Sequence, residues 1–216
     1  MRSLEDIWPF FGIRLRTRHL ELRLLTEAEQ IGLIELSSRG IHDPTWMPFG
    51  VPWTDLPEGE FERESMRHFW KGRAEWSPGQ WSLNFGVFGH SGLVGVQEIA
   101  ARDFGVLRTV ETGSWLGKDH QGKGIGKEMR AAVLAFAFEG LDAALAISGA
   151  WHDNEPSRAV SRALGYEPDG WTLMDRRGEA ERHERFRITR EGWEANRYCD
   201  VTLVGVEPCL GLLGAD

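Results

Sequence analysis

Residues 117–127 combine glycine, lysine and a helix start in a pattern that suits an anionic ligand. Gly122, Gly124 and Gly126 alternate through a turn that follows a predicted strand and directly precedes the strongest predicted helix. Glycine permits positive φ and a close backbone approach, and the first amides of a helix have no partner within that helix. These N–H groups, with the two neighbouring lysines, favour a phosphate. The segment therefore predicts a cradle for a pyrophosphate.

Two common phosphate-binding loops do not fit this segment. A Walker loop needs Ser or Thr after its Gly-Lys pair, whereas Glu128 follows Gly126-Lys127, so no hydroxyl is available for magnesium. A dinucleotide-binding fingerprint needs G-x-G-x-x-G after the first strand of a parallel sheet. Here the spacing is G-x-G-x-G, and the preceding strands read as an antiparallel meander. The cradle is expected to serve a different ligand.

The hexapeptide QGKGIG at 121–126 resembles the Q/R-x-x-G-x-G/A motif with which GNAT (Gcn5-related) acyltransferases bind coenzyme A. Two flanking segments add to the resemblance, ETGSWL at 111–116 and DNEPSRAV at 153–160, the second followed by LGY at 164–166. Both are similar to the branch that acetylates the N-termini of ribosomal proteins. The resemblance covers about residues 13–190 and implies an α/β (α+β) GNAT fold, with a mixed, mostly antiparallel central sheet and flanking helices.

Four segments also resemble a mycobacterial succinyltransferase of this family: HDPTWMPFGVPWTD, GSWLGKDHQGKGIG, EMRAAVLAFAF and DNEPSRAVSRALGY. That resemblance implies an N-acyltransferase that moves a succinyl group from succinyl-CoA to a protein lysine or other amine. Nothing in spacing or composition separates succinyl-CoA from acetyl-CoA. The alternatives are acetyl transfer from acetyl-CoA to a protein N-terminus or small molecule, and a non-catalytic acyl-CoA-binding sensor.

The family resemblance implies how the coenzyme is held. Backbone groups of 114–116 would bond the pantetheine arm, amides of 122–127 the pyrophosphate, and the Asn154 amide the arm again. The alternative for Asn154 and Ser157 is capping of the helix that begins there. The expected coenzyme-binding residues are Ser114, Trp115, Leu116, Gln121, Gly122, Lys123, Gly124, Ile125, Gly126, Lys127, Asn154 and Ser157.

The family resemblance also bears on the departing thiol. Many members protonate it with a tyrosine at the position that Ser161 occupies here. We therefore expect Ser157, directly or through water, to serve the thiol. Tyr166, where the family has Phe, is expected to be structural.

The acceptor amine must lose a proton before it attacks, which requires a carboxylate or histidine. Glu98 and Glu111, on the predicted central strands, are the candidate bases. Strand alternation puts Glu111 on the face of Gly113 and opposite Ser114. His120, beside the cradle, is expected to lie on the loop surface.

Hydrophobic periodicity predicts the elements that position these residues. Strands are expected over 13–25 (one strand, or two with a short break), 81–88, 93–99, 110–116, 145–151 and 185–189. Helices are expected from an N-cap at Thr26 to near Gly40, and over 58–70, 128–141 and 157–164, with a loop from Tyr166 onward.

Residues 42–57, HDPTWMPFGVPWTDLP, contain four prolines and two tryptophans and cannot form regular structure. They form either a packed surface loop or the lining of an acceptor or acyl pocket. Because this segment has no Lys or Arg, a succinyl carboxylate would need a partner from elsewhere.

The chain of 216 residues carries 33 acidic and 25 basic side chains, a formal net charge of −8. Its length and 41% hydrophobic content predict one domain over 1–216, with an extension over 191–216. The acidic balance argues against nucleic acid as a partner. Because no apolar stretch approaches ~20 residues and no secretory pattern is evident, we expect no membrane partner and a cytoplasmic location.

Three further features bear on thiols, metals and partners. Cys199 and Cys209 are expected to be free thiols, and the scattered histidines predict no metal site. The highly charged segment 175–191 forms either a solvated hairpin with ion pairs or a subunit or acceptor contact. The apolar segment 201–206 is expected to add a strand or to pack on a partner, and we expect a homo-oligomer.

Overall fold

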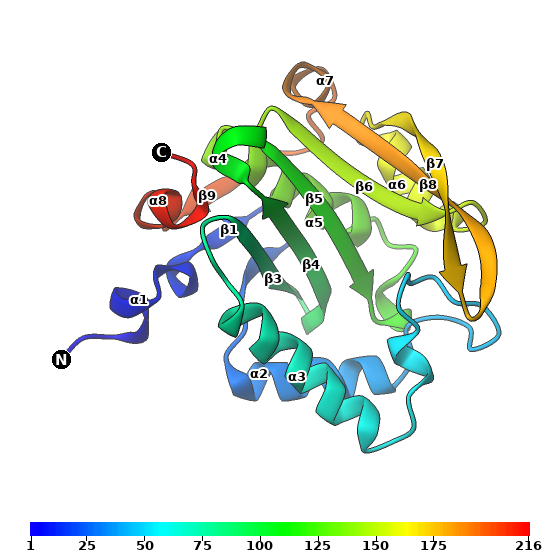
Figure 1. Cartoon of the computed structure of the whole chain (residues 1–216). Helices are drawn as coiled ribbons and strands as arrows, with labels where there is room; N and C mark the ends of the chain where they lie inside the picture. Colours follow the sequence, from blue (N-terminus) through cyan, green and yellow to red (C-terminus); the bar gives the residue numbers. More distant parts are fainter.

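The computed structural model describes all 216 residues and has one nine-stranded sheet (Figure 1). All neighbouring strands are antiparallel except β5 and β6, which run parallel. In sheet order the strands are β7 (Glu167–Arg176), β8 (Glu179–Thr189), β6 (Leu145–Trp151), β5 (Thr109–Leu116), β4 (Gly92–Arg102), β3 (Gln80–Gly89), β2 (Glu21–Leu24), β1 (Arg14–Arg16) and β9 (Thr202–Val204).

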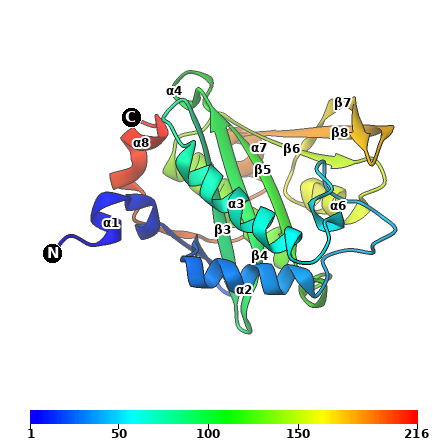
Figure 2. The same ribbon diagram turned by 60° about the horizontal axis from the view of Figure 1, so that its bottom comes forward.

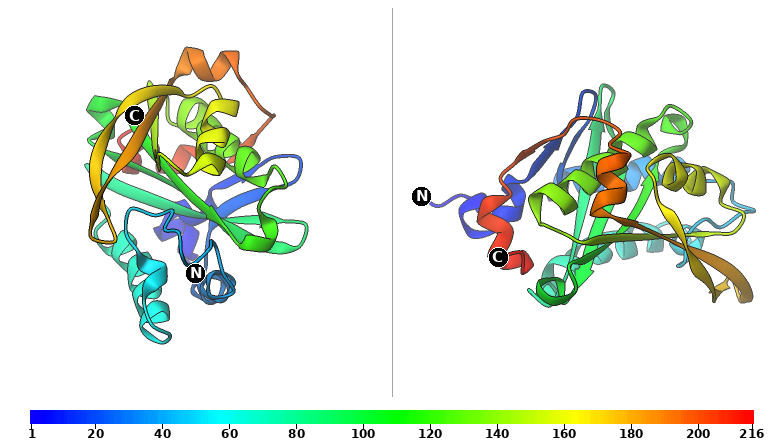
Figure 3. Two further views of the ribbon diagram at one scale, coloured as in Figure 1. Left: turned by 90° about the vertical axis from the view of Figure 1, so that its right-hand side faces the viewer. Right: turned by 90° about the horizontal axis from the view of Figure 1, so that it is seen from above.

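Helices cover both faces of this sheet. Helices α2 (Glu27–Ser38) and α3 (Glu60–Ala74) lie side by side on one face (Figure 2). Helices α5 (Ile125–Ala135) and α6 (Glu155–Ala163) lie on the other face (Figure 3, left). The short helices are α1 (Leu4–Ile7), α4 (Phe104–Leu107), α7 (Arg190–Ala195) and α8 (Leu210–Leu213). A mixed, mostly antiparallel sheet with helices on both faces is the arrangement that the resemblance implied.

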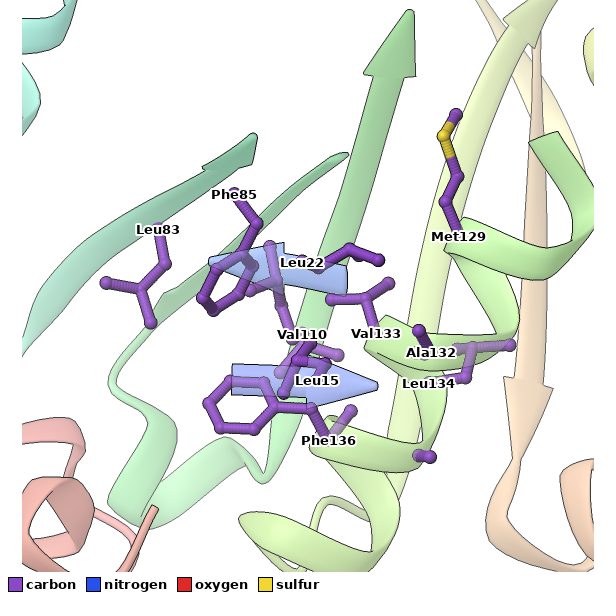
Figure 4. Close-up of a cluster of buried hydrophobic side chains, with 14 of the residues drawn as sticks. Leu15, Leu22, Leu83, Phe85, Val110, Met129, Ala132, Val133, Leu134 and Phe136 are labelled. Atoms are coloured by element: carbon purple, nitrogen blue, oxygen red, sulfur yellow. The ribbon is translucent and has the colours of Figure 1, made fainter. Parts of the chain in front are cut away.

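The main core lies between α5 and the sheet. One side of α5 and of the π-helical turn that follows it (Phe136–Gly140) packs on inward-facing strand residues (Figure 4). The spacing i, i+3, i+4, i+7 from Met129 to Phe136 places these apolar residues on one face, as predicted. Burial of this stripe fixes the position of α5, and so of its N-terminus, on the sheet.

The parallel pair β5–β6 splits part of the way along its length. Its register runs from Thr109↔Leu145 to Thr112↔Ser148 and then stops. Beyond that point β5 continues to Leu116 beside β4, whereas β6 continues beside β8 (Figure 1). The edge of β5 beyond Thr112 therefore has no strand partner on the β6 side.

Most predicted elements form near their predicted boundaries. The strand region 13–25 forms β1 and β2, and Thr26 caps α2 through a capping box with Glu29. Helix α5 begins at Ile125, three residues before the predicted start, and the short helix α4 joins β4 to β5. The tail adds the edge strand β9 beside β1.

The prediction of a loop from Tyr166 onward was wrong, because residues 167–176 form β7. Pro168 and Gly170 obscured this strand, since both residues disfavour sheet interiors. They are tolerated here because β7 is an edge strand whose register is interrupted between Pro168 and Trp171. Strands β7 and β8 thus make the charged segment 175–191 part of a hairpin.

Candidate active site

The predicted cradle is an open turn between β5 and α5. Gly122 and Gly124 have φ of 72° and 83°, values that favour glycine, and no atom would lie within 4 Å of a Cβ at either residue. The amides of residues 122–126 donate to no protein group, and the N-cap Gly124 supplies no capping side chain. Five consecutive unpaired N–H groups at the positive end of a helix suit a pyrophosphate.

Gln121 holds the start of this turn in place. Its Nε2 donates to the carbonyl of Leu116, at the end of β5, and to that of Ile41, before the irregular loop. The side chain is therefore engaged with the protein, and its contribution to the cradle is to fix the backbone. Lys123 and Lys127 flank the amides, and the Lys127 ammonium lies 5.7 Å from the Tyr198 ring centroid.

Asn154 and Ser157 lie on the far side of the split, at the start of α6. The Oδ1 atom of Asn154 accepts from the Ser157 amide at 3.2 Å. Asn154 therefore caps α6, which was the alternative to coenzyme binding that the sequence left open. This bond uses only the oxygen and leaves the Nδ2 group without a protein acceptor. The Ser157 hydroxyl is half-buried and also free of protein partners.

A cavity of about 680 Å³ lies on the opposite face, between the sheet, α2, α3 and the irregular loop. Its floor includes Glu98, Gly113 and Trp115, and Ser114 borders it. Glu60 and Glu64 of α3 add two more carboxylates, whereas no Lys or Arg lines it. A second cavity of about 510 Å³ continues along the same face and contains Glu98 and Glu111. Lys71 and Arg102 also line the second cavity, so it is the lining of the 680 Å³ cavity, with three carboxylates and no Lys or Arg, that suits a cationic ligand.

Glu98 is held in a defined orientation. The Ser82 hydroxyl donates to its Oε1 at 2.6 Å, and Asn84 Nδ2 donates to the Ser82 hydroxyl at 3.3 Å. Oε2 lies against Gly113, where a Cβ atom would stand 3.3 Å away. One oxygen of Glu98 is therefore anchored, and the other faces the part of β5 that has lost its strand partner.

Glu111 shares this face, as strand alternation predicted. Its side chain is exposed at the mouth of the second cavity, yet the surrounding protein removes enough hydration to raise its pKa, and the negative charge of Glu98 raises that pKa further. The two carboxylates therefore disfavour simultaneous ionisation. Glu98 is the nearer of the two to the split.

The irregular loop 42–57 lines the 680 Å³ cavity through Phe49, Val51, Pro52, Trp53 and Leu56. Aromatic contacts hold it, since the Trp53 ring stacks on Phe61 and lies 6.0 Å from Trp115 between ring centroids. The β7–β8 hairpin adds polar anchors. Arg176 Nε donates to the Met47 carbonyl at 2.8 Å, and Arg177 pairs with Asp55 at 2.6 Å. The loop is thus both packed and part of a pocket.

The sequence reasoning missed Ser82 and Asn84, which position Glu98, and the buried Arg130, whose Nη2 donates to Ser114. Ser and Asn on a strand carry no local signal of such a role. Arg130 falls in the helix whose apolar face dominated the pattern. His120 lies in a short 3-10 turn (Lys118–His120) beside the cradle.

The chain belongs to the GNAT family, because the acetyltransferase (GNAT) domain model matches residues 19–167, more than half of its length. It is therefore an acyl-CoA-dependent N-acyltransferase, and acetyl-CoA is the usual donor of the family. Membership argues against the alternative of a non-catalytic sensor.

Solved structures share the fold at low sequence identity. A putative acetyltransferase from T. thermophilus is 22% identical, with a TM-score of 0.68 over 85% of this chain and 93% of its own. Mycobacterium smegmatis RimJ in complex with CoA-disulfide is 21% identical, with a TM-score of 0.67 over 84% and 89%. RimL, a ribosomal L7/L12 alpha-N-protein acetyltransferase in complex with coenzyme A, is 16% identical, with a TM-score of 0.62 over 80% and 95%.

The side chains and helices show neither a metal cluster nor a membrane span. No cluster of three or more His, Cys, Asp or Glu side chains is placed to hold a metal ion. None of the helices combines the length and apolar character needed to cross a bilayer.

Proposed function

We propose that the protein transfers an acyl group from an acyl-CoA to a positively charged amine that enters the carboxylate-lined cavity. The observation that carries the proposal is the position of the split between β5 and β6, which lies between the unpaired amides of residues 122–126 and that cavity. The cradle would hold the pyrophosphate. The pantetheine arm would pass along Ser114–Leu116, bonded by the unpartnered edge of β5 and by the Asn154 amide.

In this proposal, Glu98 removes the proton from the amine, directly or through one water, so that the nitrogen can attack the thioester carbonyl. Its anchored Oε1 fixes the carboxylate while Oε2 faces the acceptor. Glu111 is the secondary candidate, because it stands further from the split. A backbone N–H on the open edge of β5 would stabilise the oxyanion. Ser157 would approach the departing sulfur from α6.

The donor that we propose is succinyl-CoA, on the strength of the sequence resemblance. Ser65, His68 and Asn84 line the cavity and offer hydrogen-bond donors to a succinyl carboxylate. Acetyl-CoA is the second candidate, favoured by a specific observation: three glutamates and no Lys or Arg line the cavity, which disfavours a second carboxylate.

A thiol-release assay with both donors tests the proposal. We expect turnover with lysine-containing peptides or other cationic amines, a mass increase on the acceptor, and a higher kcat/KM with succinyl-CoA. Equal or reversed preference overturns the succinyl assignment only. Absence of turnover across peptide lysines, peptide N-termini and small amines, with either donor, overturns the proposed acceptor class. Asn84→Ala is the matched variant, since it should reduce the succinyl rate more than the acetyl rate.

A further inference from the structure

Two arginines are buried in this protein, and they differ in their partners. Arg176 is 8% exposed and pairs with Asp153 and Glu181. Arg130 is 4% exposed and pairs with no carboxylate. Since a buried cation without a counter-charge is costly, Arg130 requires an explanation.

Three hydroxyls surround the Arg130 guanidinium. Its Nη1 donates to Ser161 at 3.1 Å and to Ser148 at 3.4 Å, and its Nη2 donates to Ser114 at 3.2 Å. The Nε group has no partner at all. Hydroxyl dipoles satisfy some donors but bring no negative charge, and burial accordingly lowers the pKa of Arg130. No carboxylate of the protein neutralises this guanidinium.

Arg130 lies where the coenzyme must cross the sheet. Ser148 is the last β6 residue paired with β5, and Ser114 stands two residues beyond the last paired residue of β5. Ser114 also borders the acceptor cavity. On α5, Arg130 follows Ile125 by five residues, about 7.5 Å along the helix axis. A ligand that starts in the cradle and ends in the cavity therefore passes Ser114.

We propose that Arg130 is the electrostatic positioning residue for the departing thiolate of coenzyme A and that the Ser114 hydroxyl donates a hydrogen bond to the sulfur. This inference rests on the proposed acyl transfer. Ser114 is half-buried, accepts from Arg130, and donates to no protein group, so its hydrogen is free for a ligand. A hydroxyl that accepts from a cation is polarised and donates more strongly.

In this proposal the acyl transfer needs no side chain that protonates the departing sulfur. The amine nitrogen forms a bond to the thioester carbonyl carbon, and its proton passes to Glu98. When the tetrahedral intermediate collapses, the carbon–sulfur bond breaks and the electron pair leaves on sulfur. The thiolate stays ionised beside Ser114 and Arg130, and takes its proton from solvent after release. Such a site removes the need for a tyrosine at position 161.

The other charged and titratable groups around the split also act on a thiolate held beside Arg130. On the cavity side β4 and β5 contribute Glu98, Arg102 and Glu111. Helix α3 contributes Glu60, Glu64, His68, Lys71 and, at its C-cap, Glu75. On the α5 side the neighbours are Tyr166 before β7, whose hydroxyl lies 3.3 Å from Thr112 Oγ1, and Arg158 on α6, which pairs with Glu184. The cavity-side carboxylates oppose a thiolate, and Arg130 is the cation that contacts Ser114 directly.

The test measures the ionisation of bound coenzyme. Binding of CoA and of desulfo-CoA would be followed against pH by calorimetry, together with the ultraviolet absorbance of the thiolate. We expect the pKa of the bound thiol to fall by about one to three units, the range for an opposite charge at 4–6 Å. Arg130→Gln should abolish the shift, Arg130→Lys should retain part of it, and Ser114→Ala should reduce it. Arg162→Gln, an equal charge change on the exposed side of α6, is the control that should leave it intact.

Several outcomes overturn the inference. A bound thiol that titrates like the free coenzyme overturns it, as does a shift that survives Arg130→Gln. If Arg130→Gln does not fold, Ser114→Ala decides, because this half-buried residue tolerates loss of a hydroxyl. Arg130→Gln should also lower kcat by about 10- to 100-fold with acetyl-CoA and succinyl-CoA alike. A loss confined to succinyl-CoA would assign Arg130 to the acyl carboxylate instead. Failure of CoA itself to bind contradicts the proposed function, whereas binding without thiol ionisation contradicts this inference alone.

Discussion

The two sides of the split sheet offer different groups to a ligand: backbone amides on one side and side chains on the other. On the α5 side, the cradle consists of consecutive backbone amides at 122–126, with glycines that keep side chains away. On the other side, the cavity is lined by side chains from α2, the 42–57 loop, α3 and three strands. Backbone amides can bind a constant feature such as a pyrophosphate, while side chains from many segments can select an acceptor. Substitutions on one side should therefore affect coenzyme binding, and substitutions on the other should affect catalysis and the acceptor.

Replacement of Glu98, the proposed base on the cavity side, should have the largest effect. Glu98→Gln keeps the shape and the Ser82 contact but cannot take a proton, so kcat should fall about 100- to 1,000-fold, within the range for general base catalysis. Calorimetry should show unchanged CoA binding. Glu111→Gln is the matched variant and should lower kcat much less. Equal losses in the two variants would show that the carboxylates act as a pair.

A side chain in the cradle should reduce coenzyme binding by about 100-fold, comparable to loss of a preorganised donor. Gly124→Ala places a Cβ atom at a residue with φ of 83°, inside the turn that carries the unpaired amides. Gly92→Ala is the control, because Gly92 has φ of 94° and equal space in the β3–β4 hairpin, and it lines neither cavity. The two variants should lose similar stability, and only Gly124→Ala should raise the Kd for CoA. Unchanged CoA affinity in Gly124→Ala would disprove the cradle.

A looser 42–57 loop should affect acceptor selection more mildly. Arg177→Ala removes the ion pair with Asp55 and the bond to the Pro44 carbonyl, so we expect the KM for the amine to rise about five- to tenfold. The KM for acyl-CoA should stay the same. Arg182→Ala, which removes an exposed arginine stacked over Trp171 on the same hairpin, controls for charge. A rise in the KM of acyl-CoA would mean that the loop serves the coenzyme.

The smallest expected effect is a pH dependence of stability. Because burial and Glu98 raise the pKa of Glu111, the folded state holds this proton at higher pH than the unfolded state. The folded state therefore loses stability as pH rises from about 4.5 through the raised pKa. Glu111→Gln removes this loss, so its Tm should exceed that of the wild type by about 1–3 °C at pH 7 and match it at pH 4. An equal Tm difference at both pH values would contradict the ionisation argument.

Local sequence signals predicted much of the fold. Thr26 and Glu29 form the expected capping box, the apolar stripe from Met129 to Phe136 forms the expected helix, and the open glycine turn lies between that helix and the split. Strand β7 escaped prediction because its edge position, which tolerates Pro168 and Gly170, is a property of the whole sheet.

The sequence by itself determined the glycine turn and the helix N-terminus of the cradle, because these depend on residues adjacent in the chain. The bond from Gln121 to the Ile41 carbonyl, which holds the turn in place, depends on the fold. Only the tertiary structure decided the carboxylate-lined cavity and the surroundings of Arg130. Ser82 reaches Glu98 through the β3–β4 register, and Arg130 meets Ser114, Ser148 and Ser161 from three other elements. Such contacts follow from strand pairing and helix packing between distant segments, so no local pattern could reveal them.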